Sequence, residues 1–530
     1  MAVSRRIRAL SAALAVAGVV GMTGCGQAPR QEPSAGRGSD QASTRTPAFE
    51  MPVEKPNLLM ITVDDLSSLD MDYLPSVKKL IGESGVTFTD AVAPTPICVP
   101  ARASLLSGQY AHNHGAHTIH GPEGGYPSFD DSATLATSLQ DAGYTTVFTG
   151  KYLNEYGEKK SKRDVPPGWD EWRATIDPST YNYLGAKFNV NGRVVKPKGY
   201  STTVITQQAQ AALRDAKKKV TPRAEADAEA DAKPWFQWVN YVAPHVGGPT
   251  QKGDPKQRFR GTKGAIGVPV PDAQDRDVYA DKPIPQQPNL FPENRKDFPK
   301  GSPSRKNPTQ IEKDAYRISH QRRIESARSL DRNIASMLEG LRASGELERT
   351  LVVFTSDNGF STGYHNFNGK LWYYHETLAI PVLMSGPGVP EGREVTTPVT
   401  NPDIATTLLA VAGAEDPHEP DGIDIMPWLR APEQARVIPI EAWPPSDGTS
   451  RLWSGVQVGR WTYVELTTGG VELYDRTTDP YEMNNLADDP DQAETVSRLA
   501  KLTEKYRDCS GDGCPKKMYA ADRPLDLTGF

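Results

Sequence analysis

The chain has 530 residues, more than one hydrophobic core usually serves, so we expect one large domain and one smaller domain. Its composition, with 37% hydrophobic and 24% charged residues, is that of an ordinary globular protein. The formal net charge of -6 argues against a nucleic-acid partner, because such partners attract proteins with an excess of Lys and Arg.

The first residues resemble an export signal. A basic segment, SRRIR, precedes the apolar run ALSAALAVAGVVGM, which is too short for a comfortable membrane span. The run leads into MTGCG, and the small residues before Cys25 fit a bacterial lipoprotein signal, although Met22 stands where Leu is commoner. We expect residues 1–24 to be removed and Cys25 to be lipidated. The alternative is a plain secretory signal with an incidental cysteine.

A tether is expected to follow the signal. Residues 25–55 are rich in Pro, Gly, Ser and charge, which is typical of a disordered linker that holds a domain away from a membrane. The expected location is therefore outside the cell membrane, extracellular or periplasmic, with the lipid at Cys25 as the contact with the membrane. A second polar stretch, TPRAEADAEADAKP, is expected to be a solvated loop or a helix end.

Four short apolar runs predict β-strands. They are NLLMITV, YTTVFT, WFQWVNYV and TLVVFTS, and helical stretches such as ATLATSLQDAG and ESARSLDRNIASMLEGLRASGEL lie between them. Apolar strands that alternate with helices predict an α/β fold with a mostly parallel sheet buried on both faces.

Each of these runs leads to polar residues that could carry chemistry. In an open α/β sheet the carboxyl ends of parallel strands meet at one edge, where ligands bind. The residues expected at this edge are Asp64, Asp65, Lys151, His245, Asp357 and Asn358. The alternative is a set of separate surface loops with solvated charges.

The oxygen-bearing side chains of this set predict a metal site. Asp64, Asp65, Asp357 and Asn358 offer only oxygen ligands, which select a hard divalent cation. A cage built mostly from protein suits Ca²⁺ better than Mg²⁺, which tends to keep several waters. Three carboxylates without a cation would repel one another.

The cationic side chains predict that an anion binds beside the metal. Arg102, Lys151, His245 and Lys370 suit a tetrahedral oxyanion such as sulfate or phosphate. ARASLLSG predicts a helix that begins near Cys98, and the N-terminus of a helix also favours an anion. Cys509 and Cys514, in CSGDGC, are expected to pair in an oxidising compartment, which leaves Cys98 without a partner.

Cys98-Val99-Pro100-Ala101-Arg102 resembles the Cys-x-Pro-x-Arg signature of the formylglycine-dependent, type I sulfatases. The resemblance extends from about residue 55 to the end through SGQYAHNHG, TSDNG, the GK that precedes YYHETLAIPVLMSGPG, and ELYDRTTDPYEMNNLADDP. It implies an alkaline-phosphatase-like sandwich at residues 56–430, followed by a subdomain with antiparallel strands at 431–530. SRLWSGVQVGRWTYVELTTGGVELYD, with turn glycines between β-rich runs, agrees with such a subdomain.

The resemblance also implies a mechanism. A formylglycine-generating enzyme would oxidise Cys98 to formylglycine (3-oxoalanine). One hydroxyl of the hydrated aldehyde would attack sulfur, and the other would let the sulfated intermediate collapse and release sulfate. The cation would be held by Asp64, Asp65, the modified Cys98, Asp357 and Asn358. Arg102 would support the hydrate, Lys151 and Lys370 would bind sulfate oxygens, and His245 would contact or protonate the leaving oxygen, alone or jointly with Lys370.

One segment departs from many sulfatases. Leu153, in GKYLNEYG, stands where those proteins have a histidine, so the base that collapses the intermediate is unassigned. With VPPGWDEW and YNYLGAKFNVNG, the segment resembles the N-acetylglucosamine-6-sulfatase branch. This predicts a sulfated glycan substrate of the 6-O-sulfo-N-acetylglucosamine type. The residues considered for sugar contact are Asn154, Glu155, Trp169, Tyr181, Asn182 and Tyr183, although core packing explains the tyrosines equally well.

Most of the remaining histidines are expected to be structural. His112, His114, His117 and His120 are placed at most near the pocket wall, and His365 either lines the pocket or packs. His320, His375 and His418 are expected at the surface or in packing.

Three other functions remain open from the sequence. The chain could be an aryl sulfatase of broad specificity, or a phosphodiesterase or phosphonate monoester hydrolase on the same scaffold. It could also be a surface lipoprotein that binds sulfated glycans with Cys98 unmodified.

Overall fold

The computed structural model describes residues 45–158, 161–220, 233–256, 266–293, 298, 307–431 and 433–520. From Ala42 onward the chain forms one compact unit. The expected signal, Cys25 and most of the expected tether lie outside the described residues, as does most of the polar stretch before Trp235. Within the described ranges, the helices are either too short or too polar to cross a membrane.

A ten-stranded sheet forms the centre of the molecule, with the order β13-β2-β12-β9-β1-β8-β4-β5-β6-β7. The five consecutive strands from β9 to β5 are parallel, and β12, β6 and β7 join the sheet through antiparallel pairs. This confirms the predicted α/β class with a mostly parallel sheet. The strands are β1 (Asn57–Val63), β2 (Gly85–Phe88), β4 (Thr145–Gly150), β5 (Glu171–Thr175), β6 (Phe188–Val190), β7 (Arg193–Val195), β8 (Trp235–Asn240), β9 (Thr350–Ser356), β12 (Val382–Ser385) and β13 (Arg393–Val395).

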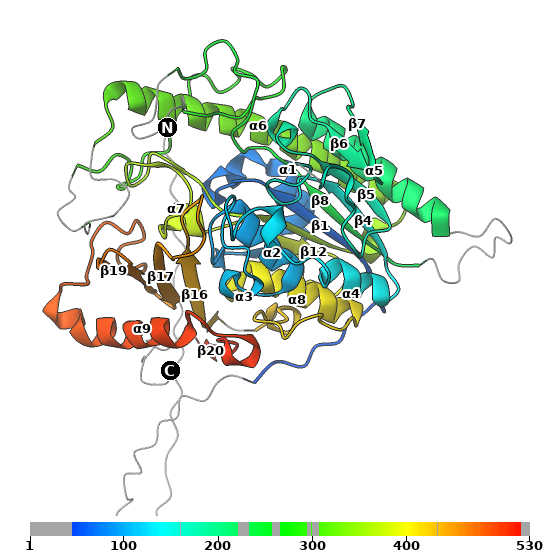
Figure 1. Cartoon of the computed structure of the whole chain (residues 1–530). Helices are drawn as coiled ribbons and strands as arrows, with labels where there is room; N and C mark the ends of the chain where they lie inside the picture. The colour runs from blue at the N-terminus through cyan, green and yellow to red at the C-terminus, as the bar shows by residue number, and fades with distance from the viewer. Residues whose placement is uncertain are drawn as a thin grey trace, which may run out of the picture. The chain divides into compact units, whose positions relative to one another are not determined.

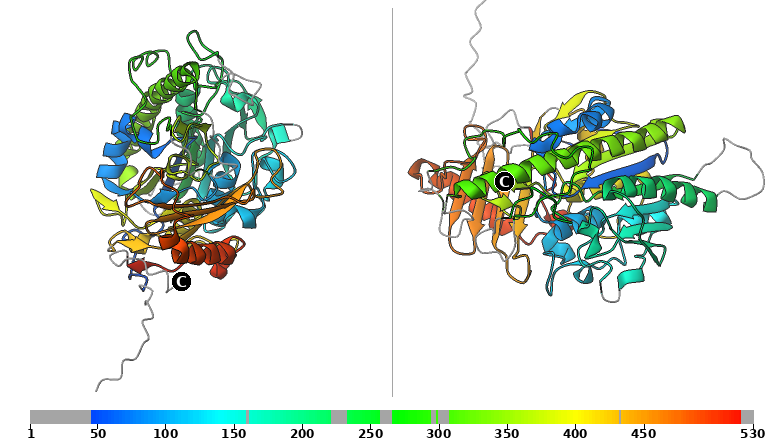
Figure 2. Two further views of the ribbon diagram at one scale, coloured as in Figure 1. Left: turned by 90° about the vertical axis from the view of Figure 1, so that its left-hand side faces the viewer. Right: turned by 90° about the horizontal axis from the view of Figure 1, so that it is seen from above.

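Helices cover both faces of this sheet, which is why its central strands are buried along their whole length and mostly apolar (Figures 1 and 2). Alternate residues of β1, such as Leu59 and Ile61, pack against α5 (Ser201–Val220) and α6 (Gln310–Ala343), which lie side by side. The residues between them, Leu58 and Met60, face the cluster that contains α2 (Cys98–Ser107), α4 (Leu135–Asp141) and α8 (Asn401–Ala412).

A second, antiparallel sheet lies in the C-terminal region, as predicted. It consists of β16 (Val437–Ala442), β17 (Trp453–Val458), β18 (Trp461–Leu466) and β19 (Val471–Asp475). One face packs on α9 (Ala493–Tyr506) through residues such as Val456 and Leu499 (Figure 2, left). The other face packs on Tyr373 and Tyr374, from the segment that follows the GK motif. The boundary expected at 430 stays a prediction.

Short elements complete the fold. They are the helices α1 (Pro75–Val77), α3 (Ala111–His114) and α7 (His375–Leu378), and the strand pairs β3 (Ala91–Val92) with β14 (Val399–Thr400), β10 (Ser361–Thr362) with β11 (Asn368–Gly369), and β15 (Gln434–Ala435) with β20 (Tyr519–Ala520).

Gly150 ends β4 in a conformation that only glycine fits. Its φ is 105°, and a Cβ there would lie 1.8 Å from the carbonyl oxygen of Asn240 on β8. We predict that Gly150→Ala forces β4 and β8 apart and lowers the free energy of unfolding by well over 1 kcal/mol. Urea denaturation measures the change.

Gly143→Ala is the matched control for this prediction. Gly143 has a similar φ of 97°, but nothing lies within 4 Å of the Cβ position. Only the backbone strain of about 1 kcal/mol is therefore expected there. Equal losses in the two variants would show that the contact with Asn240 is unimportant.

Candidate active site

Four adjacent parallel strands bring most of the predicted site residues to one edge of the sheet. The strands β9, β1, β8 and β4 are neighbours, and each ends at or just before a polar side chain. Asp357 and Asn358 follow β9, Asp64 and Asp65 follow β1, His245 lies in the loop after β8, and Lys151 follows β4. The expected meeting of these strand ends is therefore observed.

Cys98 lies at the first position of α2, as the sequence predicts. Ile97 precedes it in an extended conformation, and the whole of α2 is buried. The Cys98 Sγ donates to Asp64 Oδ1 at 3.5 Å and accepts from Lys370 Nζ at 2.7 Å. The thiol thus lies between one carboxylate and one ammonium group, and it is the free cysteine of the described chain.

Arg102, one helical turn after Cys98, ties three strand ends together. Its guanidinium is fully buried and donates from Nε to Asp357 Oδ2 at 2.8 Å. Its Nη1 donates to the backbone oxygen of Lys151 at 3.0 Å and to Asn240 Oδ1 at 2.9 Å. Asn240, the last residue of β8, is a site residue that the sequence analysis missed.

The carboxylates are held by the amino groups and by an amide. Lys151 Nζ donates to Asp64 Oδ2 at 2.6 Å, and Lys370 Nζ donates to Asp65 Oδ1. Asn358 Nδ2 donates to the same Asp65 oxygen at 2.7 Å. In the described part of the chain, the buried Asp65 Oδ2 and Asn358 Oδ1 accept no hydrogen bond. Such unpaired oxygens fit a hard cation, for which they are suitable ligands.

Ligand atoms from four of these residues also lie close enough together to share an ion. One atom each from Asp64, Asp65, Cys98 and His245 falls within 4.8 Å of the others. Asp64 and Asp65 are thus the two members of the expected oxygen set that this group contains, while Asp357 and Asn358 adjoin it through their hydrogen bonds with Asp65.

Burial and neighbouring charge shift the pKa values of these groups. Burial alone would raise the pKa of Asp64 and Asp65, but the adjacent basic side chains, among them Lys151 beside Asp64 and Lys370 beside Asp65, hold both pKa values below the usual range. Burial, reinforced by Asp64, raises the pKa of the Cys98 thiol to about 12. The unmodified thiol is thus protonated at neutral pH, unlike the thiolate of a cysteine nucleophile.

His245 presents one ring nitrogen to the site. Its Nδ1 lies 2.6 Å from the backbone oxygen of Val246, which can only accept, so Nδ1 carries a hydrogen. Its Nε2 lies 3.6 Å from Asp65 Oδ2. Burial lowers the pKa of the ring, which favours the neutral form with a hydrogen-free Nε2.

Two of the residues considered for sugar contact adjoin this site. The Tyr181 ring lies 4.6 Å from the His245 ring and 5.2 Å from Lys151 Nζ. Asn154 Nδ2 donates to the Tyr181 hydroxyl at 2.9 Å, while the buried Asn154 Oδ1 has no hydrogen-bond donor among the described residues.

The other residues considered for sugar contact have structural roles. Tyr183 is fully buried in a core cluster and donates its hydroxyl to the backbone oxygen of His245, so its ring cannot stack on a sugar. Trp169 also packs in the core. Glu155 pairs with His120, and exposed Asn182 accepts from the backbone of Leu184. The predicted sugar role is therefore wrong for Tyr183 and unsupported for these three.

Leu153 is buried in the apolar cluster beneath α2 and α4. The remaining histidines pack as expected: His114 bonds to Ser104 and Pro100, His117 stacks on Trp443, and His320 lies edge-on to Tyr73. His365 stacks on Tyr374 with ring centroids 3.8 Å apart and bonds to Asn289. These contacts give His365 a packing role.

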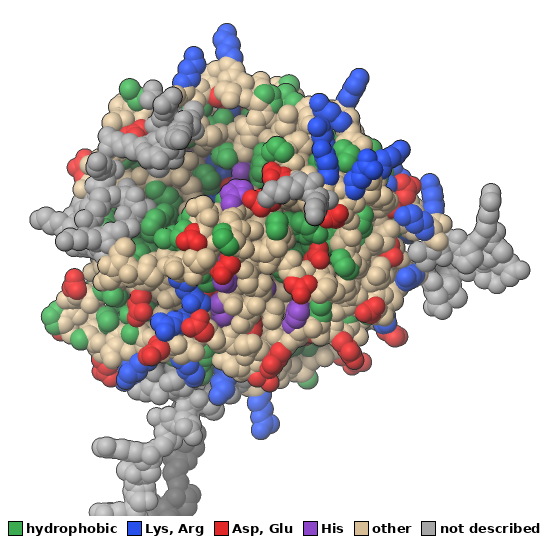
Figure 3. Space-filling model, in the orientation of Figure 1, with side chains coloured by type: hydrophobic (Ala, Val, Ile, Leu, Met, Phe, Trp, Pro, Cys, Tyr) green, Lys and Arg blue, Asp and Glu red, His purple; other side chains and the backbone are tan. Residues whose placement is uncertain are grey.

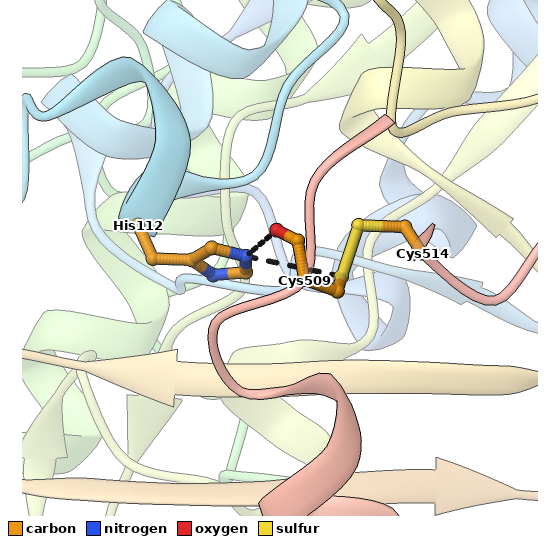
Figure 4. A group of neighbouring side chains, drawn as sticks. All are labelled: His112, Cys509 and Cys514. Atoms are coloured by element: carbon orange, nitrogen blue, oxygen red, sulfur yellow. Dashed lines mark hydrogen bonds between the residues drawn. A yellow bond between two sulfur atoms is a disulfide. The ribbon is translucent and has the colours of Figure 1, made fainter. Parts of the chain in front are cut away.

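A second His and Cys group lies near the C-terminal end of the described chain (Figure 4). Cys509 and Cys514 form a disulfide, as predicted, and His112 Nε2 lies 2.9 Å from the Cys509 backbone oxygen. The paired sulfurs are unable to act as thiolate ligands, so this group is structural although its atoms are close together.

On the face shown in Figure 3, acidic and basic side chains are interspersed and histidine side chains are visible near the middle.

Comparison with known proteins gives a family match over most of the chain. The model of the family described as "Sulfatase" matches residues 56–414, and that described as "N-sulphoglucosamine sulphohydrolase, C-terminal" matches residues 363–508.

Curated relatives agree with this match. An arylsulfatase of Volvox carteri is 28% identical, with 87% of this chain and 76% of the relative covered. An N-acetylglucosamine-6-sulfatase of Homo sapiens is 28% identical over 71% of this chain and 64% of the relative. An extracellular sulfatase SULF-1 homolog of Drosophila melanogaster is 29% identical over 72% of this chain, which spans only 32% of that relative.

Solved structures share the fold. One protein, solved in complex with its substrate D-glucosamine-2-N,6-O-disulfate, superposes with a TM-score of 0.67 at 20% identity, over 85% of this chain and 97% of that chain. A phosphonate monoester hydrolase from Silicibacter pomeroyi superposes with a TM-score of 0.59 at 21% identity, over 86% and 96% of the two chains. With the family match covering well over half of its length, this chain belongs to the sulfatase family of sulfuric ester hydrolases.

Proposed function

We propose that the protein hydrolyses sulfate esters of sulfated glycans, with 6-O-sulfo-N-acetylglucosamine groups as its preferred substrate. The single observation that carries the sulfatase function is the position of Cys98. It lies at the N-terminus of α2, bonded to Asp64 and Lys370, at the edge where four parallel strands end.

The modification and the cation are parts of this proposal. A formylglycine-generating enzyme converts Cys98 to formylglycine, and Asp64, Asp65, Asp357 and Asn358 hold Ca²⁺ next to it, with Mg²⁺ as a weaker fit. The unpaired oxygens of Asp65 and Asn358 support such a ligand set. When in place, formylglycine supplies the nucleophile and the cation offsets the negative charge of the sulfate group.

The side chains of the chain itself bind the sulfate and handle its leaving group. Lys151 and Lys370 bind sulfate oxygens. Lys151 bonds to Asp64 and Lys370 bonds to Cys98, so both amino groups lie near the position of the reacting group. Arg102 fixes Asp357 and the start of the Lys151 loop. The neutral His245 ring carries no hydrogen on Nε2, so this nitrogen, which faces the carboxylates, has to take up a proton before it can pass one to the leaving alcohol; the Lys370 ammonium group is the second proton donor.

The residues beside Lys151, Tyr181 and Asn154, support a sugar as the substrate. Tyr181 is partly exposed, and Asn154, a residue that is 7% exposed, has a buried carboxamide oxygen without a hydrogen-bond donor among the described residues. An aromatic face with a few polar groups is typical of a sugar site. The relatives named N-acetylglucosamine-6-sulfatase support the choice of sugar.

A broad aryl sulfatase is the second candidate, since a relative with that activity in its name aligns with 87% of the chain. A phosphonate monoester hydrolase shares the fold alone. Rates of sulfate release from sulfated sugars and aryl sulfates, compared with phosphate release from aryl phosphates, separate the glycan sulfatase, the aryl sulfatase and the phosphonate or phosphate ester hydrolase.

The export proposal concerns residues that lie outside the described structure. Cys25 becomes the lipidated first residue of the mature chain and anchors it outside the cell membrane. The mass of the mature N-terminus and the partition of the protein with membranes test this proposal, with Cys25→Ala as the variant. A mature soluble chain that begins elsewhere would contradict it.

Maturation of Cys98 is the first prediction of the proposed function. Protein co-produced with a formylglycine-generating enzyme is expected to react with hydrazides at the peptide that contains Cys98 and to release sulfate from its substrate. Cys98→Ala is expected to fold, react with no hydrazide at this peptide and release no sulfate. Peptide mass spectrometry and sulfate assays measure both, and active protein with a free Cys98 thiol would refute the mechanism.

Metal dependence is the next prediction. Chelation is expected to abolish activity, and Ca²⁺ is expected to restore it at least as well as Mg²⁺, because the ligand set is rich in protein oxygens. Calorimetric titration of Cys98→Ala protein with Ca²⁺ measures binding without turnover. A stoichiometric zinc ion in active protein would contradict the assignment.

The substrate panel gives the last prediction of this section. The enzyme is expected to prefer 6-O-sulfated N-acetylglucosamine to 4-O-sulfated N-acetylgalactosamine, and to hydrolyse aryl sulfates and aryl phosphates poorly. Asn154→Ala is expected to raise KM for the preferred sugar about tenfold, because one hydrogen bond to a sugar hydroxyl is lost.

Asn182→Ala is the control for that variant, since Asn182 is exposed and bonds to Leu184 rather than to the site. It is expected to leave KM unchanged. Faster hydrolysis of aryl sulfates or galactose sulfates would end the sugar assignment and leave the sulfatase assignment intact, whereas faster hydrolysis of aryl phosphates would end both.

A further inference from the structure

The backbone directly after Lys370 is strained. Leu371 has a φ of 86°, a region that side chains other than glycine rarely occupy. A residue keeps such a conformation only when its surroundings hold it there, at a cost of about 1–3 kcal/mol. The contacts that hold Leu371 therefore also decide where the neighbouring Lys370 points.

Both backbone groups of Leu371 are fixed by other parts of the chain. Its N–H donates to the backbone oxygen of Pro96 at 3.1 Å, in the loop that leads to Cys98. Its carbonyl oxygen accepts from the indole Nε1 of Trp453 at 3.0 Å. Trp453 is the first residue of β17 and is fully buried. Leu371 is thus held between the Cys98 loop and the C-terminal sheet.

A second contact with the same sheet lies two residues further along. The hydroxyls of Tyr373 and Tyr374 both donate to the carboxyl group of Glu472, on β19. Tyr474 donates to it as well, at 2.5 Å. The three hydroxyl groups supply hydrogen bonds to the buried Glu472 carboxyl group, whose oxygens need donors.

These anchors lead to a residue that bonds directly to the site. Lys370 Nζ contacts Cys98 Sγ and Asp65 Oδ1. Pro96 holds the N–H and Trp453 the carbonyl of the next residue, Leu371, so a change in the Leu371 backbone alters how the Lys370 amino group approaches both atoms. A buried indole N–H needs an acceptor. For the Trp453 indole this acceptor is the carbonyl oxygen of Leu371, the strained residue next to Lys370, and not a carbonyl of the C-terminal sheet.

We propose that the C-terminal sheet positions Lys370 for the reaction, with Trp453 as the main positioning residue and Glu472 as the second anchor. The proposal rests on the proposed function, in which Lys370 binds the sulfate group. It makes the C-terminal sheet a part of the active-site machinery through its contacts with Leu371, Tyr373 and Tyr374.

A double-mutant cycle between positions 453 and 370 tests the proposal. Trp453→Phe keeps an aromatic ring and removes the N–H donor, and is expected to lower kcat at least tenfold with a change in KM below threefold, because Lys151 still binds the sulfate. In a Lys370→Ala background the same substitution is expected to have no further effect on kcat. Additive losses in kcat would show general damage to the fold and overturn the proposal.

Trp461→Phe is the matched control. Trp461 is the first residue of the neighbouring strand β18 and makes its ring contact with Arg460, away from Leu371. This variant is expected to keep wild-type kcat and KM. A loss equal to that of Trp453→Phe would also overturn the proposal.

A second variant and a readout without turnover keep the test independent of folding and of the proposed function. Glu472→Gln is expected to lower kcat less than Trp453→Phe, again with no further effect in the Lys370→Ala background. In protein produced without maturation, Trp453→Phe is expected to increase acetylation of Lys370 severalfold, measured by peptide mass spectrometry, while Trp461→Phe leaves it unchanged. Unchanged acetylation in all variants overturns the positioning role, whereas a wild-type enzyme that releases no sulfate refutes the proposed function alone.

Discussion

The buried guanidinium of Arg102 is the interaction on which the arrangement of the site depends. It joins Asp357 after β9, Asn240 at the end of β8 and the Lys151 backbone after β4, and it projects from the helix that begins at Cys98. A planar group with several fixed donors suits this task better than a lysine ammonium would. Removal of one partner of a buried ion pair costs about 3–5 kcal/mol, so the strand ends and Cys98 are held in one geometry.

Charge balance accounts for the close approach of three buried carboxylates. The carboxylates of Asp64 and Asp65 pair with Lys151 and Lys370, and that of Asp357 pairs with Arg102. In the proposed function a divalent cation takes over Asp64 and Asp65, and their two lysines become available to the sulfate oxygens.

Sequence reasoning located the strand-end residues because their signal is local. An apolar run that ends in Asp64-Asp65 or Asp357-Asn358 is visible in a short window, and the parallel topology then brings the ends together. Asn240 was missed because it lies inside such a run, although a buried amide among apolar residues is itself a signal of a polar partner. Tyr183 was misjudged because spacing does not reveal which side of a loop faces the core. Trp453 and Glu472 depend on contacts between segments about 80 to 100 residues apart, which no local pattern encodes.

The loop after β4 shows how one segment divides its residues between the core and the site. Tyr152, Leu153 and Tyr156 are buried in the apolar cluster, where Tyr152 packs edge-on against Phe148. Lys151 and Asn154, on the same loop, reach the carboxylates and Tyr181 instead. An apolar Leu153 therefore adds packing that fixes Lys151 and Asn154, where a histidine at this position would have added a proton carrier. His245, Lys151 and Lys370 are then the described nitrogen groups near Cys98 that could carry a proton, and Trp453 links the position of Lys370 to the C-terminal sheet.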